Sequence, residues 1–383
     1  MPDLYSEDGV DVKSGDSFSA SAGRVCVESF RNSPHVRVTD LSQGYFRGVR
    51  GFRFHHLPRG YFQEMTSDGN GTKVVLTAAA GMYRQSPRDL LAMTGMDITR
   101  NGGKGLIFNN VLDVKVLGEP GTPTHQAYIE MIEGLGEAAR ELKLVLFRGE
   151  TAELSVCISS ENPASDVQFN WSGTMLGVYL KRLLITGNTI EPGMLIVAFR
   201  ELGFRANGIS STRKALARQF GPEWWNNPEA VKYIKMAAEP SVLYDPLLQY
   251  LNGWETEGFE RPVTMHSLIH LSGGAFKGKL GEDILFRRGL SADLPDLWEP
   301  SEIMSHCAEW RGMDDEGAYE TWNGGQGALA IMWKGEAPFA IRKAAEYGIE
   351  AKVCGEVTKW DIPSVRIQSK FASGKEIIYE AAA

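Results

Sequence analysis

The sequence predicts a globular protein of two domains that mixes helices with strands. Its 383 residues exceed a single typical domain, because domains usually hold about 100–200 residues. Hydrophobic residues make up 43% of the chain and charged residues 23%, which is typical of a protein with a full core. Amphipathic helical stretches alternate with short apolar runs, and the pattern changes near Leu184. We therefore expect one domain at 1–183 and a second at 184–383.

Net charge and cysteine spacing disfavour several classes of protein. The formal net charge is −8, which argues against a nucleic-acid-binding surface. No run of about 18 apolar residues is present, so no segment is expected to span a membrane. The acidic N-terminus lacks the apolar stretch of a signal peptide. The four cysteines stand far apart, which disfavours a zinc site or disulfide framework and fits a reducing cytoplasm.

The first stretches of the chain are polar or rich in glycine and arginine. Residues 1–25 are too polar for a core strand and are expected to form an arm. Between 41 and 60, glycines and arginines alternate, among them Gly48, Arg50 and Gly51. Guanidinium groups on a flexible backbone suit a polyphosphate, because Arg can bind two phosphate oxygens at once. The alternative is a solvated loop whose arginines balance an acidic chain.

The stretch 66–73, Thr-Ser-Asp-Gly-Asn-Gly-Thr-Lys, combines the groups of a phosphate site. It contains a carboxylate, two glycines, a hydroxyl and an ammonium group: Asp68, Gly69, Gly71, Thr72 and Lys73. Glycines let backbone N–H groups approach an anion, and a carboxylate beside them can hold Mg²⁺. The β-prone run 74–77 follows, so the alternative is a tight turn between two strands.

Helical and strand patterns then alternate up to the end of the first domain. A helix from Pro87 carries Asp97 near its end and stops at 101–103. A strand at 106–108 should end at Asn109 and Asn110. The strongest amphipathic helix covers 127–143, and a buried strand follows at 144–147.

That strand opens directly into Arg148-Gly149-Glu150-Thr151-Ala152-Glu153. Acidic residues just beyond a strand end lie where open sheets place ligand chemistry. The alternative is a helix N-cap, since Thr with a nearby Glu commonly starts a helix.

The second domain shows the same alternation. Strands are expected at 175–180, which closes the first domain, and then at 194–199, 267–272, 328–333 and 351–357; helices are expected at 224–238, 243–251 and 338–347. The segment 203–208 begins and ends with glycine before a helix, which offers N–H groups to an anion, although a plain loop fits as well.

The order of these motifs resembles one family across most of the chain, aminoimidazole ribonucleotide synthetase, also called phosphoribosylformylglycinamidine cyclo-ligase. The resemblance is carried by segments 5–11, 67–73, 91–97, 148–153, 203–208, 270–274 and 323–327. Some positions depart from the family pattern: Met96, Asn110, Arg148, Asn170, Arg205 and Ala206. Asn110 and Asn170 stand where the family commonly has aspartate, and Arg205 where it usually has histidine.

The resemblance implies two α+β domains, with an N-terminal sheet that forms a barrel in a homodimer. It implies ATP and Mg²⁺ as cofactors, leaves K⁺ open, and indicates a phosphosugar substrate. The implied catalytic residues are Asp68, Lys73 and His270. The implied ATP and phosphate ligands are Gly48, Arg50, Gly51, Gly69, Gly71, Thr72, Arg148, Gly149 and Thr151. Arg205, Asn207 and Gly208 would bind the substrate, and Asp68, Asp97, Asn110 and Glu150 would bind the metal.

The implied reaction is the ATP-dependent cyclisation of formylglycinamidine ribonucleotide in purine synthesis. A guanidinium such as Arg205 suits phosphate binding better than proton transfer, because it does not titrate near neutrality. His270 is either a general acid/base or a packed strand histidine. Two alternatives stay open at this point: another ATP-using member of the superfamily with a different substrate, and a nucleotide-binding protein that has lost its catalytic residues.

Overall fold

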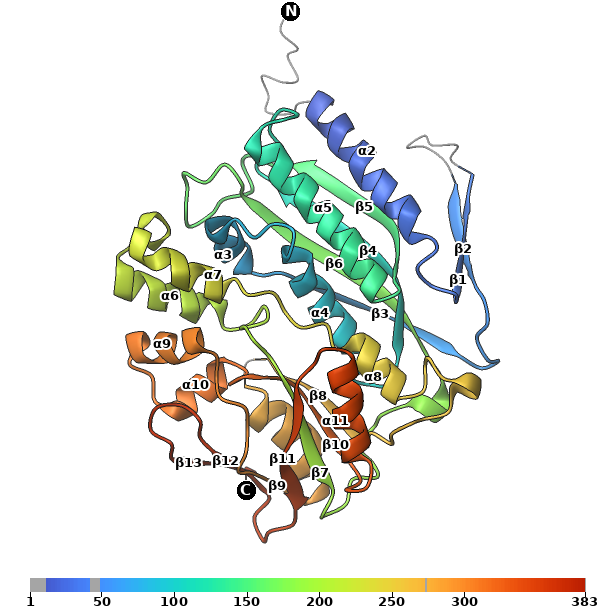
Figure 1. Ribbon diagram of the computed structural model, residues 1–383, viewed down its shortest axis with the longest axis vertical. Coiled ribbons are helices and arrows are strands. Elements are labelled where there is room, and N and C mark those ends of the chain that lie inside the picture. The colour runs from blue at the N-terminus through green and yellow to red at the C-terminus, as the bar shows by residue number, and fades with distance from the viewer. Residues whose placement is uncertain (1–11, 42–48, 273, 383) are drawn as a thin grey trace, which may run out of the picture. The chain divides into compact units, whose positions relative to one another are not determined.

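The computed structural model describes residues 12–41, 49–272 and 274–382, and the chain divides into two compact units (Figure 1). The first unit comprises 1–98 and 103–182, and the second comprises 99–102 and 183–383. Residues 1–11 of the polar arm expected at 1–25 and the glycine at Gly48 lie outside the described residues. Within the described residues, no helix is both long and apolar enough to cross a membrane.

In its described residues, the first unit combines a four-stranded sheet with a two-stranded hairpin and four helices of eight or more residues. Its elements are α2 (Val12–Ser29), β1 (Val36–Asp40), β2 (Arg50–Phe54), β3 (Phe62–Gly69), α3 (Lys73–Ala80), α4 (Ser86–Thr99), β4 (Lys104–Val114), α5 (Pro123–Glu141), β5 (Val145–Glu153) and β6 (Phe169–Tyr179). The sheet order is β3-β6-β4-β5, with β4 and β5 parallel and the other pairs antiparallel.

Helices cover one face of this sheet. Figure 1 shows α4 and α5 across that face, with α2 beside α5. Side chains of alternate strand residues point to it, including the fully buried Phe108, Leu112 and Trp171. The residues between them point away from the helices and are more exposed, among them Met65 and Val111. The expected barrel with a second copy would use this exposed face, and that expectation stays a prediction.

The second unit is built on a seven-stranded sheet. Its strands and longer helices are β7 (Leu195–Arg200), α6 (Ile209–Phe220), α7 (Val231–Ala237), α8 (Asp245–Leu251), β8 (Ser267–His270), η5 (Phe276–Leu285), β9 (Ser291–Leu294), α9 (Glu302–Arg311), α10 (Asp315–Thr321), β10 (Gln326–Met332), α11 (Ala337–Glu346), β11 (Ala351–Thr358), β12 (Ser364–Gln368) and β13 (Glu376–Glu380). Short single-turn helices lie at Lys181–Leu183, Trp224–Asn226, Pro228–Ala230, Glu257–Phe259 and Phe286–Arg288.

This second sheet has the order β13-β12-β9-β11-β7-β10-β8. All neighbours are antiparallel except β12 and β9. Every residue of β10 is buried, and so is every residue of β8. Continuous burial explains why these strands read as unbroken apolar runs in the sequence.

The predicted mixture of helices and sheets is confirmed, and five local predictions are wrong. The strand expected to end at Asn109 and Asn110 continues through both residues to Val114 in β4. Residues 12–25 form most of helix α2 rather than an arm, and 74–77 lie in helix α3 rather than a strand. Segment 148–153 belongs to strand β5 instead of following it, and 224–238 is broken into two single turns and α7. In α3, packing overrides the β propensity of the branched residues, because Val75 and Leu76 are buried on one side of the helix.

Candidate functional site

A cavity of about 680 Å³ lies in the first unit beside the edge strand β5. Helix α2 forms one wall with small side chains such as Ala22 and Cys26, and Ile132 and Leu135 of α5 add apolar surface. The cavity is also lined by the following residues that the sequence singled out: Arg50, Asn110, Arg148, Gly149, Glu150 and Thr151. Residues far apart in the sequence therefore meet at one hollow with apolar and charged walls, which is the usual form of a small-molecule site.

The strand edge beside this cavity is covered by polar groups from α2 and the residues after it. The Ser29 hydroxyl accepts a hydrogen bond from the Leu146 N–H at 2.8 Å. Asn32 Nδ2 donates to the carbonyl of Leu144 at 2.9 Å, and Arg50 Nη1 donates to that of Phe147 at 3.3 Å. These bonds satisfy edge groups that would otherwise pair with another chain, and they anchor the end of α2 against β5.

Arg50 is held at the rim of the cavity by a carboxylate. Its Nε and Nη2 both donate to Asp40 Oδ2, at 3.0 and 2.8 Å. The guanidinium also lies over the Phe30 ring, 5.1 Å from its centre. Asp40 therefore balances much of the positive charge that the sequence assigned to phosphate binding. Gly51, the neighbouring candidate, lies in strand β2 with open space around its Cα.

Residues 148–151 present both faces of an edge strand to the cavity. The pairing of β4 with β5 shifts in register between Phe108 and Asn109. Beyond this shift, Asn109 lies opposite Arg148 and Asn110 lies opposite Gly149. Asn109 Oδ1 accepts a hydrogen bond from the Arg148 N–H at 3.0 Å and supports the shift. Because neighbouring strand residues point to opposite faces, Arg148 and Glu150 leave the sheet on one side, and Gly149 and Thr151 on the other.

The four predicted metal ligands do not meet. In the sheet, Asp68 of β3 lies opposite Gly173 of β6, and Gly173 lies opposite Asn110 of β4. The side chains of Asp68 and Asn110 are therefore two strand spacings, or about 10 Å, apart. The Phe108 ring fills the space between them, because a Cβ on Gly173 would lie 2.1 Å from Phe108 Cζ. Glu150 pairs with Val111, one residue along, and so points to the opposite face.

Two of these side chains also have other hydrogen-bond partners. Asn110 Oδ1 accepts from Trp171 Nε1 at 3.0 Å, and Asp68 Oδ1 accepts from the Gly69 N–H at 2.7 Å. Asp97 lies half-buried on α4. In the parts of the chain that the structure describes, no three His, Cys, Asp or Glu side chains are grouped as a metal site requires. The residues present do not fit the Mg²⁺ site of Asp68, Asp97, Asn110 and Glu150 that the sequence predicted.

The motif at 66–73 joins a strand to a helix and not to a second strand. Strand β3 ends at Gly69 and helix α3 begins at Lys73, with Thr72 exposed at the N-cap. Gly71 has a positive φ of 53°, which favours glycine, and Gly69 packs so close to Trp171 that a Cβ would lie 3.0 Å from its carbonyl oxygen. The glycines thus shape a tight strand-to-helix turn.

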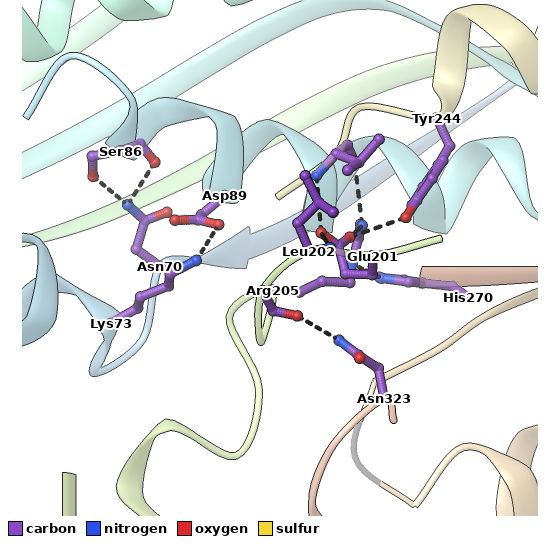
Figure 2. A network of polar contacts seen from close by, with 12 residues as sticks. Asn70, Lys73, Ser86, Asp89, Glu201, Leu202, Arg205, Tyr244, His270 and Asn323 are labelled. Atoms are coloured by element: carbon purple, nitrogen blue, oxygen red, sulfur yellow. Dashed lines mark hydrogen bonds and ion pairs between the residues drawn. The ribbon is translucent and has the colours of Figure 1, made fainter. Parts of the chain in front are cut away.

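Inside this turn, Asn70 and Lys73 point into the protein (Figure 2). Asn70 Nδ2 donates to the backbone oxygen and the hydroxyl of Ser86, at 3.3 and 3.0 Å. Lys73 Nζ forms an ion pair with Asp89 Oδ1 at 2.7 Å, with both side chains almost fully buried. An ammonium group committed to an internal carboxylate differs from the predicted phosphate contact of Lys73, and it ties α3 to α4.

Arg205 of the second unit is also internal (Figure 2). Its Nη1 donates to Glu201 Oε2 at 2.8 Å and to the carbonyl of Val242 at 3.2 Å. Its Nε donates to His270 Nε2 at 3.1 Å, and the Tyr244 ring lies 5.4 Å from the guanidinium carbon. With none of its surface exposed, Arg205 does not reach a substrate phosphate as the sequence suggested, because every direction around it is filled by protein.

His270 is enclosed by the same network. Burial and the nearby cations Arg205, Lys279 and Arg100 hold its pKa well below the usual value. A neutral ring whose Nε2 accepts from Arg205 supports the packed-histidine alternative over the general acid/base.

The remaining substrate candidates lie at the start of α6. Gly208 is the N-cap of α6 with a φ of 67°, and its carbonyl accepts from Trp322 Nε1 at 3.2 Å. A Cβ there would lie 2.4 Å from Trp322 Cδ1, so this position requires glycine. Asn207 precedes it and is half-buried.

Sequence reasoning missed the residues of α2 and the partners of the buried ions. The polar composition of 12–29 concealed an amphipathic helix whose small residues line the cavity. Glu201 lies four residues before Arg205 but outside a helix, and Tyr244 comes from a distant segment, so no helical spacing connects them to Arg205. The small side chains at Ala22, Gly23 and Cys26 were the one available signal of a hollow beside that helix.

Comparison with known proteins gives relatives in sequence and in fold. No protein-family model matches the chain. It is 27% identical to a phosphoribosylformylglycinamidine cyclo-ligase of Thermococcus kodakarensis over 81% of this chain and 82% of that one. A cyclo-ligase of Pyrococcus horikoshii is 24% identical over 93% and 95% of the two chains, and one of Prochlorococcus marinus is 27% identical over 93% and 95%.

Solved structures share the fold. A thiamine-monophosphate kinase from Stenotrophomonas maltophilia has a TM-score of 0.59 and 14% identity, with 92% of this chain and 97% of that chain covered. The hydrogenase maturation protein HypE in complex with ATP has a TM-score of 0.57 and 14% identity, with 94% and 95% covered. The resemblance to the cyclo-ligases is thereby confirmed, and the chain shares its fold with these two solved structures.

Proposed function

We propose that this chain, a divergent relative of the phosphoribosylformylglycinamidine cyclo-ligases, uses ATP to close an imidazole ring on formylglycinamidine ribonucleotide. In this reaction the formyl amide oxygen attacks the γ-phosphorus of ATP and ADP leaves. The amidine nitrogen then attacks the activated carbon, inorganic phosphate leaves, and the ring closes to give aminoimidazole ribonucleotide. The similarity to curated cyclo-ligases over most of the chain carries this proposal.

The cavity beside β5 is the proposed nucleotide site. Apolar surface from Ile132 and Leu135 suits a flat base. Arg148 and Thr151 leave β5 on opposite faces, and they supply a cation and a hydroxyl for oxygens of different phosphate groups at the strand edge. Phosphoryl transfer depends on positioning and charge neutralisation more than on covalent help from the protein. Arg148, which replaces a glycine of the family pattern, adds a positive charge to the lining of this cavity.

A second candidate is another ATP-using reaction on this fold. Two observations favour it: Asn110 stands where the family pattern has aspartate, and the predicted metal ligands do not converge. The fold neighbours include a thiamine-monophosphate kinase, a protein named for a different substrate. A catalytically inactive nucleotide-binding protein is the extreme of the same alternative.

A single assay distinguishes a cyclo-ligase from another ATP-using enzyme and from an inactive nucleotide-binding protein. The purified protein is mixed with ATP, formylglycinamidine ribonucleotide, Mg²⁺ and K⁺, and both ADP and the aminoimidazole product are measured. We expect equal amounts of the two products, and none when the ribonucleotide is omitted. ATP binding without ADP formation would favour the inactive protein, and ADP formation only with another phosphate acceptor would favour the second candidate. Omission of each cation in turn tests whether Mg²⁺ and K⁺ are needed.

The homodimer is proposed on the same grounds. The face of the four-stranded sheet that the helices leave open carries Met65 and Val111, which are 65% and 40% exposed. Exposed apolar side chains on a flat sheet are a suitable surface for a second copy. Light scattering of the purified chain tests this, with the mass of a monomer as the contradicting result.

A further inference from the structure

Three cations act on the histidine at the end of strand β8 in the second unit. Arg205, Lys279 and Arg100 each act on His270, and all three lower its pKa. Arg205 is paired with the buried Glu201, and His270 is neutral, as shown above. Lys279 and Arg100 have other partners as well, but both are only half-buried, so a ligand at the surface of this unit can approach them.

Lys279 is fixed in place by the backbone that follows β8. Its Nζ donates to the carbonyl oxygen of His270 at 3.2 Å and to the Ser272 hydroxyl at 2.5 Å. The lysine belongs to η5 (Phe276–Leu285), which is a π-helix. Helices of this kind are rare and are often retained at functional sites. The ammonium and the hydroxyl are therefore held together as neighbouring donors.

Arg205 and His270 give this pair a rigid base. Arg205 has a φ of 55°, an unusual backbone conformation for a residue other than glycine, and it persists because Glu201, Val242 and His270 all bind its guanidinium. The bond from Arg205 to His270 fixes the end of β8, whose carbonyl in turn orients Lys279. Arg205 is thus a positioning residue that acts through His270.

We propose that Lys279 and Ser272 bind the phosphate monoester of the substrate, with Arg100 adding positive potential. An ammonium and a hydroxyl supply charge-assisted and neutral hydrogen bonds to phosphate oxygens, which is the usual chemistry of a phosphate subsite. The contact assigned to Arg205 from the sequence would therefore be made by Lys279. This inference rests on the proposed function only for the identity of the phosphosugar.

The test measures binding of ribose 5-phosphate, inorganic phosphate and ribose to the intact protein by calorimetry at constant ionic strength. Lys279→Gln is the test variant, and Lys277→Gln is its matched control, an exposed lysine on the same helix. We expect Lys279→Gln to weaken ribose 5-phosphate binding about 10- to 100-fold, since hydrogen bonds to charged groups contribute about 1.5–3 kcal/mol. The Lys277→Gln protein should bind within about twofold of wild type, and Lys279→Arg should retain most of the affinity.

The outcomes separate the ligand sources and the two proposals. A phosphate subsite is supported if the wild-type protein binds ribose 5-phosphate and inorganic phosphate but not ribose. It is overturned if ribose binds equally well, or if none of the three compounds binds. Equal weakening by Lys277→Gln and Lys279→Gln also overturns it. If Lys279 controls phosphosugar binding but no ring closure occurs, the subsite stands and the proposed function fails. If ring closure occurs and Lys279→Gln leaves the KM for the ribonucleotide unchanged, the subsite fails and the function stands.

Discussion

Arg205 donates its Nε–H to Nε2 of His270 at 3.1 Å, and neither side chain is open to solvent. The two residues come from a loop after β7 and from the end of β8, which are far apart in the sequence. From the sequence motifs, Arg205 was expected to bind the substrate and His270 to be a catalytic residue. Their contact instead makes them part of the internal support of the second unit.

Removal of the Arg205 charge should destabilise the protein. Arg205→Met leaves the buried carboxylate of Glu201 without its cation, and such a loss costs about 3–5 kcal/mol. Urea unfolding followed by fluorescence gives the free energy of unfolding. Arg287→Met, in an ion pair that is mostly exposed, is the control and should remain close to wild type. A loss below about 1 kcal/mol for Arg205→Met would show that Glu201 is solvated or paired elsewhere.

His270 should make stability fall in acid. Its pKa is lowered in the folded state, so the unfolded chain binds a proton more readily. The stabilisation from the neutral ring is complete above the unfolded pKa of about 6.5 and is lost as the pH falls from there toward the lower folded value. Wild type should then lose up to about 1.4 kcal/mol per pH unit more than His270→Gln. Unfolding curves between pH 7.5 and pH 5 measure this difference, and parallel loss in both proteins would contradict it.

Lys73 and Asp89 should behave as a structural pair. Asp89→Asn leaves a buried ammonium with a neutral partner, and we expect a loss of about 3–5 kcal/mol in the free energy of unfolding. Glu141→Gln breaks the more exposed pair with Arg88 and should cost at most about 1 kcal/mol. If Lys73 were instead a catalytic residue, Lys73→Met would keep normal stability and lose turnover. That result would return Lys73 to the phosphate site.

Arg148 should matter for nucleotide binding and little for stability. Its side chain is exposed beside the cavity, so Arg148→Ala removes a phosphate contact without opening a hole in the core. We expect ATP affinity to fall about 10-fold, the effect of about 1.4 kcal/mol. Arg140→Ala, an exposed residue of α5, is the control for a general loss of charge. Equal affinities for wild type and Arg148→Ala would remove the cavity beside β5 from the proposed nucleotide site.

Periodicity predicted most of the elements that have a regular face. The helix at 127–143 was visible because its apolar residues recur at helical spacing, and it appears as Pro123–Glu141. The strand of 351–357 appears as Ala351–Thr358. The helix at 12–29 was not visible, since small and polar residues along it hide the buried face that packs on α5 and β5.

By itself, the sequence determined the class of fold, the order of the motifs and the resemblance to one family, because these depend on local pattern and residue type. Only the tertiary structure decided which charges are available. Lys73 and Arg205 stand in segments that resemble ligand loops, yet each faces a buried carboxylate. Asp89 lies 16 residues after Lys73, and Glu201 lies four residues before Arg205 in a stretch that is not helical. Whether a charged side chain meets solvent or a partner is set by packing between distant segments, and local sequence carries little of that information.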